Sequence, residues 1–395
     1  MKKIMIYCQH LAGMGHLVRC REIIQALVKD FEVCFVTGGQ LVPQFQLPPE
    51  ATVVYLPALR QQGAILVPLD AACSLESIKA KRQQQLLDTY DQFQPDCLIT
   101  ECFPFSKMSM KYELSPLLKR AKASVKPVRI VCSLRDLVMT QPLPDGPRER
   151  REAKICRLID RFYDAVLVHG DPIFQQLEEC FSLVNLLNCE IIYTGYVAQA
   201  LTASSRLSEN LCEPSIVASV GGGRHGYPLL NAVIAASSLI QEQLPHHFYA
   251  FAGPFMPDQE FVQLQRAAAD RPNLTLRRYT SELLAYLNKA DLSINLGGYN
   301  TTMNLLETGV RSLLLPSLNP SQTDEQRLRG EKLAHLGIVN LLTAQDLVPE
   351  RLMAAIATSL SHLPTPHQID LHGAENTASY LSKLLAEQPV LAAAS

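Results

Sequence analysis

The run Ile216-Val217-Ala218-Ser219-Val220-Gly221-Gly222-Gly223-Arg224-His225-Gly226 joins an apolar, β-branched segment to a loop with four glycines in six residues. The apolar segment predicts a buried strand over 216–220, and a helix is expected after Pro228. Successive glycines after a buried strand cost chain entropy, and close approach of the backbone to an anionic ligand explains them best. The stretch therefore predicts one unit of a parallel α/β sheet with a loop suited to a diphosphate. A tight turn without a ligand is the alternative.

The same alternation of short apolar runs and longer amphipathic stretches continues in both directions, which is typical of βαβ units. Strands in the first half are predicted over Lys3–Cys8, Glu32–Thr37, Asp96–Thr100, Val128–Ser133, Ala165–Val168 and Glu190–Thr194, with helices over Leu17–Lys29 and Leu75–Phe93. The strands after 216–220 are predicted over Phe248–Ala252, Leu274–Arg278, Leu292–Leu296 and Ser312–Leu315. The fold class is therefore α/β, with two Rossmann-like, doubly wound parallel sheets whose strand ends are expected to face a central cleft.

The length of 395 residues, 47% of them hydrophobic, is too great for a single core. We expect an N-terminal domain over residues 1–195, a linker of mixed polarity over 196–214 and a C-terminal domain over 215–365. Residues 366–395 are expected to form a last helix that packs back across the domain junction.

The balance of charge and the cysteine content limit the classes of protein to which this chain can belong. The 36 Lys and Arg residues balance 38 Asp and Glu residues, which argues against a nucleic-acid-binding protein. The eleven cysteines contain no C-x-x-C pair, and we find neither an export signal nor an apolar run long enough to span a membrane. We therefore expect a cytoplasmic protein with reduced thiols.

The first glycine loop, Gly13-Met14-Gly15-His16, follows the first strand and opens a helix. A dinucleotide site would require a third glycine at position 18, which is Val18, so NAD binding is not favoured. His16 lies at the helix start, where the helix dipole disfavours the imidazolium form, so a neutral ring can accept a proton. A polar helix cap without chemistry is the alternative for His16.

Two carboxylates are further candidates for the base, because they end strands whose carboxyl ends face the predicted cleft. Glu101 ends the strand over 96–100, and Asp136 follows the next strand in Ser133-Leu134-Arg135-Asp136. A structural ion pair is the alternative for Asp136, since it stands next to an arginine.

A second set of polar residues in the C-terminal half is predicted to bind a ligand. The loop after strand 292–296 supplies Gly297, Gly298, Asn300 and Thr301. Glu307, on the following helix, carries a carboxylate that can accept two ribose hydroxyls, with simple solvent exposure as the alternative. The segment Asp324-Glu325-Gln326 is predicted to start another helix and to hold the hydroxyls of a sugar.

Basic and apolar residues interleave between Phe103 and Lys126, with Glu113 as the single acid between Lys107 and Lys126. This pattern suggests peripheral contact with anionic lipid through residues 103–126. The alternative is a solvated helix face beside an ordinary core stripe.

Together, the two glycine loops, the Gly297-Gly298…Glu307 stretch and the 324–326 segment resemble glycosyltransferases of the MurG type, which have the GT-B fold. The motifs Glu101-Cys102-Phe103-Pro104-Phe105 and His169-Gly170-Asp171-Pro172 resemble a bacterial branch called "predicted glycosyltransferase". The resemblance implies transfer of a sugar from a UDP-sugar to an acceptor hydroxyl of a lipid or small molecule.

The resemblance also implies roles for individual residues. It places Gly221, Gly222 and Gly223 at the diphosphate, Glu307 at the ribose, Glu325-Gln326 at the sugar and the backbone near Tyr279 and Thr280 at the uracil, with His16 near the reacting sugar. The family's Gly-Asn-Pro-Val-Arg turn reads Gly195-Tyr196-Val197-Ala198-Gln199 here, so Arg224 or Arg329 is expected to replace the missing cation. The usual Gln-Gln pair is Glu325-Gln326, which leaves the donor sugar open.

The sequence contains no Asp-x-Asp motif, so a metal ion bound between carboxylates is not expected. We also expect no cofactor and an in-line, inverting displacement. Two alternatives stay open. The run Gly13-Met14-Gly15-His16-Leu17-Val18-Arg19-Cys20 resembles the G-x-G-H-x-x-R-C loop of PseG-type UDP-sugar hydrolases, which use water in place of an acceptor. A nucleotide-sugar-binding protein without activity is the other alternative.

Overall fold

A computed structural model describes most of the chain. The described residues are 1–11, 14–42, 45–62, 65–138, 145–201, 207, 210–240, 244–318 and 323–386. They form two compact units. The first unit comprises Met1–Leu41, Gln46–Val197 and Ile369–Ser395, and the second comprises Val42–Phe45 and Ala198–Gln368. The chain thus leaves the first unit two residues after the expected end of the N-terminal domain, and residues 198–214, expected as a linker, belong to the second unit.

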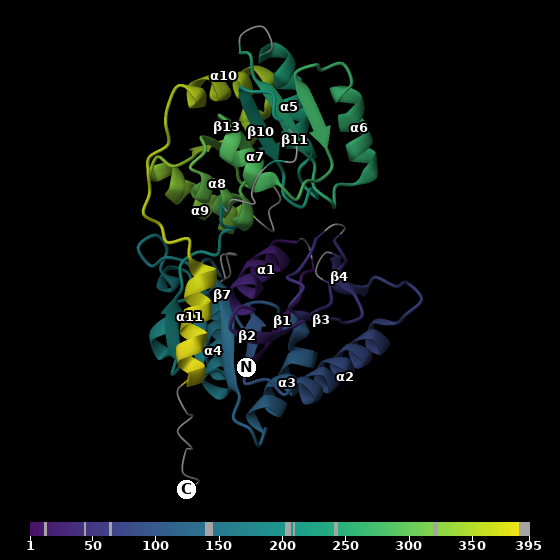
Figure 1. Ribbon diagram of the computed structural model, residues 1–395, viewed down its shortest axis with the longest axis vertical. Helices are drawn as coiled ribbons and strands as arrows, with labels where there is room; N and C mark the ends of the chain where they lie inside the picture. Colours follow the sequence, from purple (N-terminus) through teal and green to yellow (C-terminus); the bar gives the residue numbers. More distant parts are fainter. Residues whose placement is uncertain are drawn as a thin grey trace. The chain divides into compact units, whose positions relative to one another are not determined.

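The first unit is built on a seven-stranded parallel sheet with the order β3-β2-β1-β6-β7-β8-β9 (Figure 1). Its strands are β1 Lys2–Cys8, β2 Phe31–Thr37, β3 Thr52–Tyr55, β6 Cys97–Glu101, β7 Arg129–Arg135, β8 Ala165–His169 and β9 Glu190–Tyr193, with a separate antiparallel hairpin of β4 Leu59–Gln62 and β5 Ile65–Pro68. The sequence missed the hairpin because its first strand, Leu-Arg-Gln-Gln, has no apolar alternation. It also missed β3, a four-residue edge strand.

The helices of the first unit cover both faces of this sheet. They are α1 Gly15–Leu27, α2 Leu75–Phe93, α3 Lys111–Lys122, α4 Asp145–Phe162 and α11 Gly373–Ala386. Helix α11 packs against α1, whereas α3 packs against α2 and α4. The connection from β1 runs towards β2, but the later strands add on the other side of β1, beginning with β6. Loops on either side of such a reversal diverge and leave room for a ligand at the carboxyl ends of the strands.

The second unit repeats this plan with a six-stranded parallel sheet of order β12-β11-β10-β13-β14-β15. Its strands are β10 Ser215–Ser219, β11 His247–Phe251, β12 Leu274–Arg277, β13 Leu292–Leu296, β14 Ser312–Leu315 and β15 Asn340–Leu341. Its helices are α5 Tyr227–Ile240, α6 Asp258–Ala268, α7 Leu283–Lys289, α8 Tyr299–Thr308, α9 Thr323–His335 and α10 Pro349–Leu360. The reversal falls between β10 and β13, so the loops that follow these two strands open at one place. The α/β class and the doubly wound parallel sheets are confirmed.

The return of the chain to the first unit is fixed by backbone hydrogen bonds. Tyr196 donates its N–H to the carbonyl oxygen of Asp370 at 2.7 Å, and the N–H of Gly373 donates to the carbonyl oxygen of Tyr196 at 2.9 Å. Gly195, with φ +82°, cannot be replaced without a clash, because an added Cβ would lie 2.6 Å from the Asp370 carboxylate. The C-terminal helix α11 is thereby tied to the last strand of the first unit.

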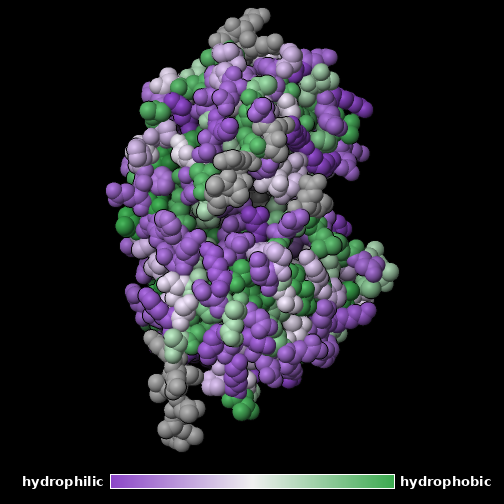
Figure 2. All heavy atoms as spheres, in the orientation of Figure 1, coloured by the Kyte–Doolittle hydropathy of each residue, from purple (hydrophilic) through white to green (hydrophobic). Residues whose placement is uncertain are grey.

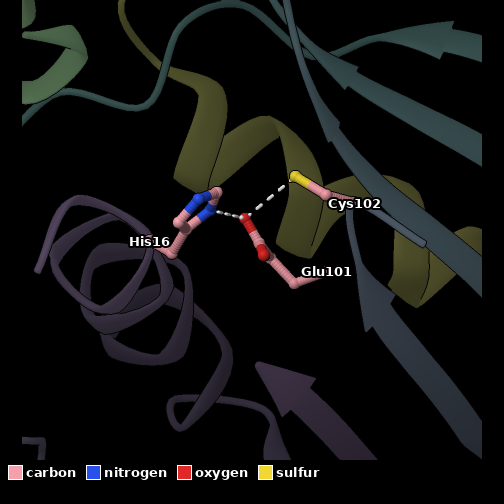
Figure 3. Close-up of side chains that lie close together, drawn as sticks. All are labelled: His16, Glu101 and Cys102. Carbon is pink, nitrogen blue, oxygen red and sulfur yellow. Dashed lines mark hydrogen bonds and ion pairs between the residues drawn. The ribbon is translucent and has the colours of Figure 1, made fainter. Parts of the chain in front are cut away.

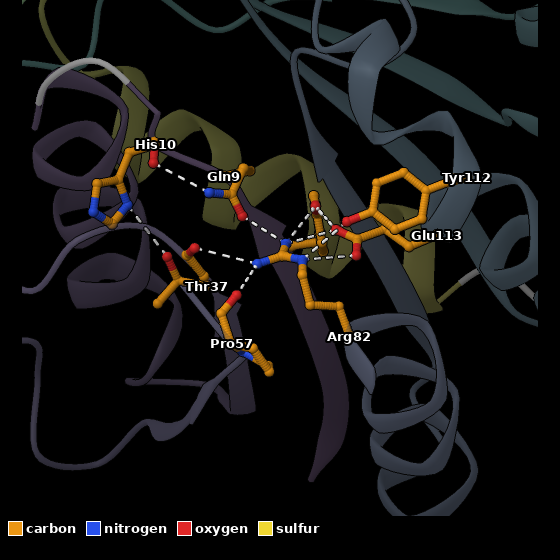
Figure 4. Close-up of polar contacts among 9 residues, drawn as sticks. Gln9, His10, Thr37, Pro57, Arg82, Tyr112 and Glu113 are labelled. Carbon is orange, nitrogen blue, oxygen red and sulfur yellow. Dashed lines mark hydrogen bonds and ion pairs between the residues drawn. The ribbon is translucent and has the colours of Figure 1, made fainter. Parts of the chain in front are cut away.

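A buried arginine joins four segments of the first unit (Figure 4). Arg82 of α2 binds Glu113 of α3 through two bonds, from Nη2 to Oε1 at 2.7 Å and from Nε to Oε2 at 2.9 Å. Its remaining N–H groups donate to the carbonyl oxygens of Gly38 and Pro57 and to Oε1 of Gln9. Both charged side chains are fully buried, and each is the counter-charge that stabilises the other away from water.

The stretch over residues 103–126 does not have the surface predicted for membrane contact. Phe103, Phe105 and Met110 are completely buried in the core of the first unit. These side chains cannot enter a lipid surface, so the expected apolar face is wrong at these positions.

Several basic residues of this stretch form ion pairs with nearby acids. Arg120 contacts Asp91 at 2.7 Å, and Lys122 lies 3.5 Å from Asp164. The surface over α2 and α3 in Figure 2 is largely hydrophilic. The structure thus matches the alternative, a solvated helix face beside a core stripe. Among the described residues, no helix is long and apolar enough to cross a membrane.

Replacing Glu113 by Gln is expected to lower the free energy of unfolding by about 3–5 kcal/mol, because the buried Arg82 guanidinium loses its counter-charge. Urea unfolding measures the change. Glu76→Gln is the matched control, since Glu76 forms an ion pair with Lys79 but its side chain is 82% exposed. A loss as small in Glu113→Gln as in the control would contradict the role given to this ion pair.

Candidate functional site

The strand reversal in the first unit brings two of the predicted residues together. His16 opens α1 after β1, and Glu101 ends β6, the neighbouring strand. Nδ1 of His16 lies 2.6 Å from Oε1 of Glu101 (Figure 3). The Glu101 side chain is fully buried, whereas that of His16 is 17% exposed. The sequence proposed these residues as separate candidates for the base, and the fold makes them partners.

Arg19, one helical turn after His16, donates from Nη2 to the same Glu101 oxygen, Oε1. The Cys102 thiol also contacts this oxygen, at 3.1 Å. Burial by itself raises the pKa of Glu101, but His16 and Arg19 outweigh it and hold that pKa well below its usual value. Glu101 is therefore a carboxylate, and it can only accept hydrogen bonds.

An ionised Glu101 fixes the tautomer of His16. Nδ1 must carry the proton that it donates to Glu101, so Nε2 keeps its lone pair and can accept a proton. Burial, together with the cations of Lys107 and Arg135, lowers the pKa of His16 to about 3 against the opposite effect of Glu101. A neutral histidine oriented by a buried carboxylate is the arrangement of a general base.

His16, Glu101 and Cys102 lie close enough to share a metal ion, since their ligand atoms are all within 4.8 Å of one another. Two features favour a hydrogen-bonded base over a metal site. The Arg19 cation already contacts the carboxylate, and burial raises the pKa of the Cys102 thiol to about 12, which disfavours the thiolate that a metal requires.

Of the other predicted residues of the first unit, the structure describes Asp136 and Gly15. Asp136 is 1% exposed, and its carboxylate accepts a hydrogen bond from the Tyr196 hydroxyl at 3.1 Å. This hydrogen bond gives Asp136 a structural partner other than an arginine, and its role as a base stays a prediction. Gly13 lies outside the described residues, and Gly15 is the exposed first residue of α1.

Two glycines of the 221–226 loop are needed by the fold itself. An added Cβ at Gly223, where φ is +92°, would lie 2.2 Å from the carbonyl oxygen of Ala252. At Gly226 it would lie 2.3 Å from the Val220 side chain. Packing against neighbouring backbone and side chains therefore explains part of the glycine run, for which the sequence favoured a ligand over a tight turn.

The remaining glycines leave backbone accessible at the reversal between β10 and β13. A Cβ built on Gly221, where φ is +59°, meets no atom nearer than Thr301 Oγ1 at 3.9 Å. Gly298 caps α8 at φ −64° and ψ 147°, and no atom lies within 4 Å of its added Cβ. Gly221 thus lies beside the first turn of α8, where backbone N–H groups and the helix dipole favour an anion.

Two further polar side chains of the second unit have buried polar atoms without hydrogen-bond partners within the part of the chain that the structure describes. Arg224 stacks over the Phe255 ring at 5.6 Å from its centroid, and its buried Nε has no partner. Asn295, near the end of β13, is completely buried, and neither polar atom of its amide has a partner. Buried polar atoms without protein partners indicate bound water or ligand. The sequence did not select Asn295, because an asparagine inside an apolar run carries no motif.

The predicted ribose-binding residue has a protein partner. Oε1 of Glu307 accepts the backbone N–H of Leu201 at 3.2 Å. Glu307 lies about 12 Å along α8 from Tyr299, the first residue of this helix. Asn304 lies nearer the start of α8, is 4% exposed, and donates from Nδ2 to Gln199 at 3.1 Å. Its Oδ1 has no partner among the described residues. Asn304 is therefore a candidate that sequence reasoning missed, and the ribose role of Glu307 stays a prediction.

Arg329 and Glu325 form an ion pair on one face of α9, with Nη2 and Oε1 2.9 Å apart. The Arg329 guanidinium also lies over the ring of Tyr299, the first residue of α8, at 5.2 Å from its centroid, and Arg329 is 1% exposed. These contacts hold α9 against the start of α8. Arg224 is therefore better placed than Arg329 as the cation for an anionic ligand.

Gln326 is positioned by the loop after β14, because its Oε1 accepts the N–H of Ser317 at 2.9 Å. It also lies beside the second glycine loop, since an added Cβ at Gly297 would be 3.5 Å from the Gln326 side chain. Asp324 lies 3.9 Å from Arg327, at the beginning of the same helix. The contacts of these residues with a sugar stay a prediction.

Tyr279 and Thr280 follow β12 at the same edge of the sheet. The loop after β11 is joined to this segment by a hydrogen bond from Gly253 N–H to the carbonyl oxygen of Arg278 at 2.7 Å. Thr280 Oγ1 accepts the N–H of Glu282 at 3.0 Å, which turns the chain into α7. Their position on the carboxyl edge is compatible with the predicted contact to a base, which stays a prediction.

Comparison with known proteins agrees with this geometry. Residues 217–383 match the glycosyltransferase family 28 C-terminal domain. A curated relative from Lactococcus lactis subsp. lactis (strain IL1403) is UDP-N-acetylglucosamine--N-acetylmuramyl-(pentapeptide) pyrophosphoryl-undecaprenol N-acetylglucosamine transferase. It is 24% identical over 165 residues, which cover 42% of this chain and 45% of the relative.

Solved structures extend the likeness over nearly the whole chain. The calicheamicin glycosyltransferase CalG4 matches with a TM-score of 0.63 and 14% identity over 99% of both chains. MurG from Acinetobacter baumannii matches with a TM-score of 0.54 and 15% identity over 98% of this chain and 100% of that chain. A protein described as a putative UDP-N-acetylglucosamine 2-epimerase from Listeria monocytogenes matches with a TM-score of 0.63 and 12% identity over 98% of both chains.

At these low identities the solved structures establish the fold alone. The family match covers the part of the chain that holds the loops of Gly221 and Gly298. The chain has the GT-B fold, and residues 217–383 match the glycosyltransferase family 28 C-terminal domain.

Proposed function

We propose that the protein is a glycosyltransferase that moves a sugar from a UDP-sugar to an acceptor hydroxyl. The observation that carries the proposal is the family 28 match over 217–383, because this range contains the loops of Gly221 and Gly298 and the helix α8. In this proposal the second unit binds the donor, and the first unit supplies the base.

The diphosphate of the donor lies between the Gly221 backbone and the start of α8 in this proposal. Backbone N–H groups, the helix dipole and the Arg224 guanidinium meet the negative charge that develops on the leaving UDP. No metal and no cofactor takes part. Support comes from the unfilled space beside Gly221 and Gly298 and from the partnerless Nε of Arg224 among the described residues.

His16 acts as the general base in the proposed reaction. Nε2 takes the proton of the acceptor hydroxyl while the acceptor oxygen bonds to the anomeric carbon. The bond from that carbon to the UDP oxygen breaks, and UDP leaves with the electron pair. This single in-line displacement inverts the anomeric configuration. Glu101 holds the ring and stabilises the imidazolium that forms.

The donor and acceptor are proposed from the curated relative. Its name gives UDP-N-acetylglucosamine as the donor and a pyrophosphoryl-undecaprenol lipid as the acceptor, so these are the first substrates to test. A lipid acceptor would place the enzyme in the cytoplasm, at the inner face of the membrane. Glu325 beside Gln326 allows a different sugar, and a panel of UDP-sugars is therefore needed.

Hydrolysis of a UDP-sugar is the second candidate function. The G-x-G-H-x-x-R-C pattern over residues 13–20 favours it, and Arg19 of this pattern contacts the Glu101 oxygen that holds His16. Water would then replace the acceptor hydroxyl at the same base. The size of the first unit, which is large enough for an acceptor site, favours transfer.

His16→Ala is expected to lower turnover by about 10²–10⁴-fold, because the acceptor hydroxyl loses its proton acceptor. UDP release from each UDP-sugar, with and without acceptor, measures the rate, and calorimetry checks that UDP-sugar affinity is kept. Loss of no more than a few-fold would exclude His16 as the base. Release of free sugar without acceptor would identify a hydrolase, and binding without release would identify a protein that only binds nucleotide sugars.

Gly298→Ala is expected to weaken UDP binding by about tenfold or more while the fold is kept. The new methyl group has room within the protein but would stand where the diphosphate approaches α8. The cost at this helix cap is at most about 1 kcal/mol. Gly223→Ala is the contrasting variant, since its methyl group would clash with backbone and destabilise the unit itself. Unchanged UDP affinity in a folded Gly298→Ala protein would contradict the proposed diphosphate site.

A further inference from the structure

We propose that Arg19 is a positioning residue that keeps His16 neutral, and so able to accept a proton at Nε2, by contacting the Glu101 oxygen that holds the ring. The inference rests on the role of His16 proposed above. It concerns the protonation of the protein alone, so substrate is not needed to test it.

The geometry makes Arg19 and His16 share one acceptor. They are three residues apart on α1, which places both side chains on the face that meets the end of β6. Nδ1 of His16 and Nη2 of Arg19 both reach Oε1 of Glu101. The other oxygen, Oε2, is buried and has no partner among the described residues. Both donors therefore contact one carboxylate oxygen, and Nη2 of Arg19 also lies 3.6 Å from the Cys102 sulfur.

The balance of charge determines the state of the ring. The Glu101 side chain is 0% exposed and that of Arg19 is 2% exposed, so the carboxylate needs a cation close by. Arg19 supplies that charge permanently, because a guanidinium does not lose its proton in proteins. Without Arg19, the nearest group able to balance Glu101 is the imidazole, which would then be charged. A charged imidazole cannot act as a base.

Other groups that face His16 act independently of Arg19. Lys107, which precedes the 3₁₀ turn Met108–Met110, and Arg135, at the end of β7, disfavour the imidazolium form, whereas Glu101 favours it. Cys102 is a neutral thiol beside the same carboxylate. Lys107 and Arg135 remain when Arg19 is replaced. They therefore limit the rise in the pKa of His16 but do not reverse it.

Arg19→Gln removes the positive charge and keeps a hydrogen-bond donor. It therefore separates the effect of the Arg19 charge from the effect of its hydrogen bond to Glu101. NMR titration of histidine-labelled protein is expected to show the pKa of His16 raised by about one pH unit or more in this variant. Arg19→Lys, which keeps the charge, is expected to titrate like the unmodified protein. Arg21→Gln is the matched control, because Arg21 lies on the same helix but forms its ion pair with Glu22.

A folded Arg19→Gln protein with the unmodified titration of His16 would overturn the proposal. If this variant does not fold, the double variant Arg19→Gln/Glu101→Gln removes both buried charges and is compared with Glu101→Gln alone. The proposal expects the pKa of His16 to differ by well under about one pH unit between these two proteins, because only the direct repulsion between Arg19 and the ring is then lost. A rise of about one pH unit or more in the double variant would overturn it.

Activity provides a separate readout. In Arg19→Gln the rate of UDP release is expected to fall at a higher pH on the acid side of its pH profile. This shift is expected to follow the rise in the pKa of His16 that NMR measures. An unmoved acid limb in a protein whose His16 titration has shifted would show that His16 is not the base, and thus count against the proposed function. The NMR result would still decide the role of Arg19.

Discussion

The reversal of strand order beside β1 and again beside β10 is the constraint on which the candidate sites depend. Parallel strands require crossover helices, and these run in opposite directions from β1 and from β10. The loops that follow the central strands therefore diverge and leave backbone and side chains accessible at the carboxyl edge. His16 and Glu101 meet at the first reversal, and the loops of Gly221 and Gly298 flank the second.

Two buried ion pairs serve different purposes in the first unit. Arg82 and Glu113 bind through two bonds, and the arginine also bonds to loop carbonyls, so this pair fixes the ends of several segments. Arg19 and Glu101 share the carboxylate with His16, whose Nε2 stays available. The first arrangement uses its charges for structure, whereas the second leaves one proton acceptor beside a fixed negative charge.

The fold alone does not distinguish the possible reactions, because proteins named as glycosyltransferases and as an epimerase share it at similar TM-scores. Chemistry depends on the few side chains at the strand ends. A neutral histidine held by a carboxylate suits deprotonation of either an acceptor hydroxyl or water. The difference between transfer and hydrolysis therefore depends on what the first unit binds next to His16.

The sequence alone determined the α/β class, most strands of both sheets and the two glycine loops, because local periodicity and glycine content carry these features. The polar strand β4 was missed, because its residues Leu-Arg-Gln-Gln show no apolar alternation, although it pairs locally with β5. Only the tertiary structure showed that Gly223 serves packing, that Phe103 and Phe105 belong to the core, and that Asn295 and Asn304 carry unpartnered polar atoms among the described residues. It alone joined His16, Arg19 and Glu101, because residues 85 positions apart meet only when β1 and β6 pair side by side.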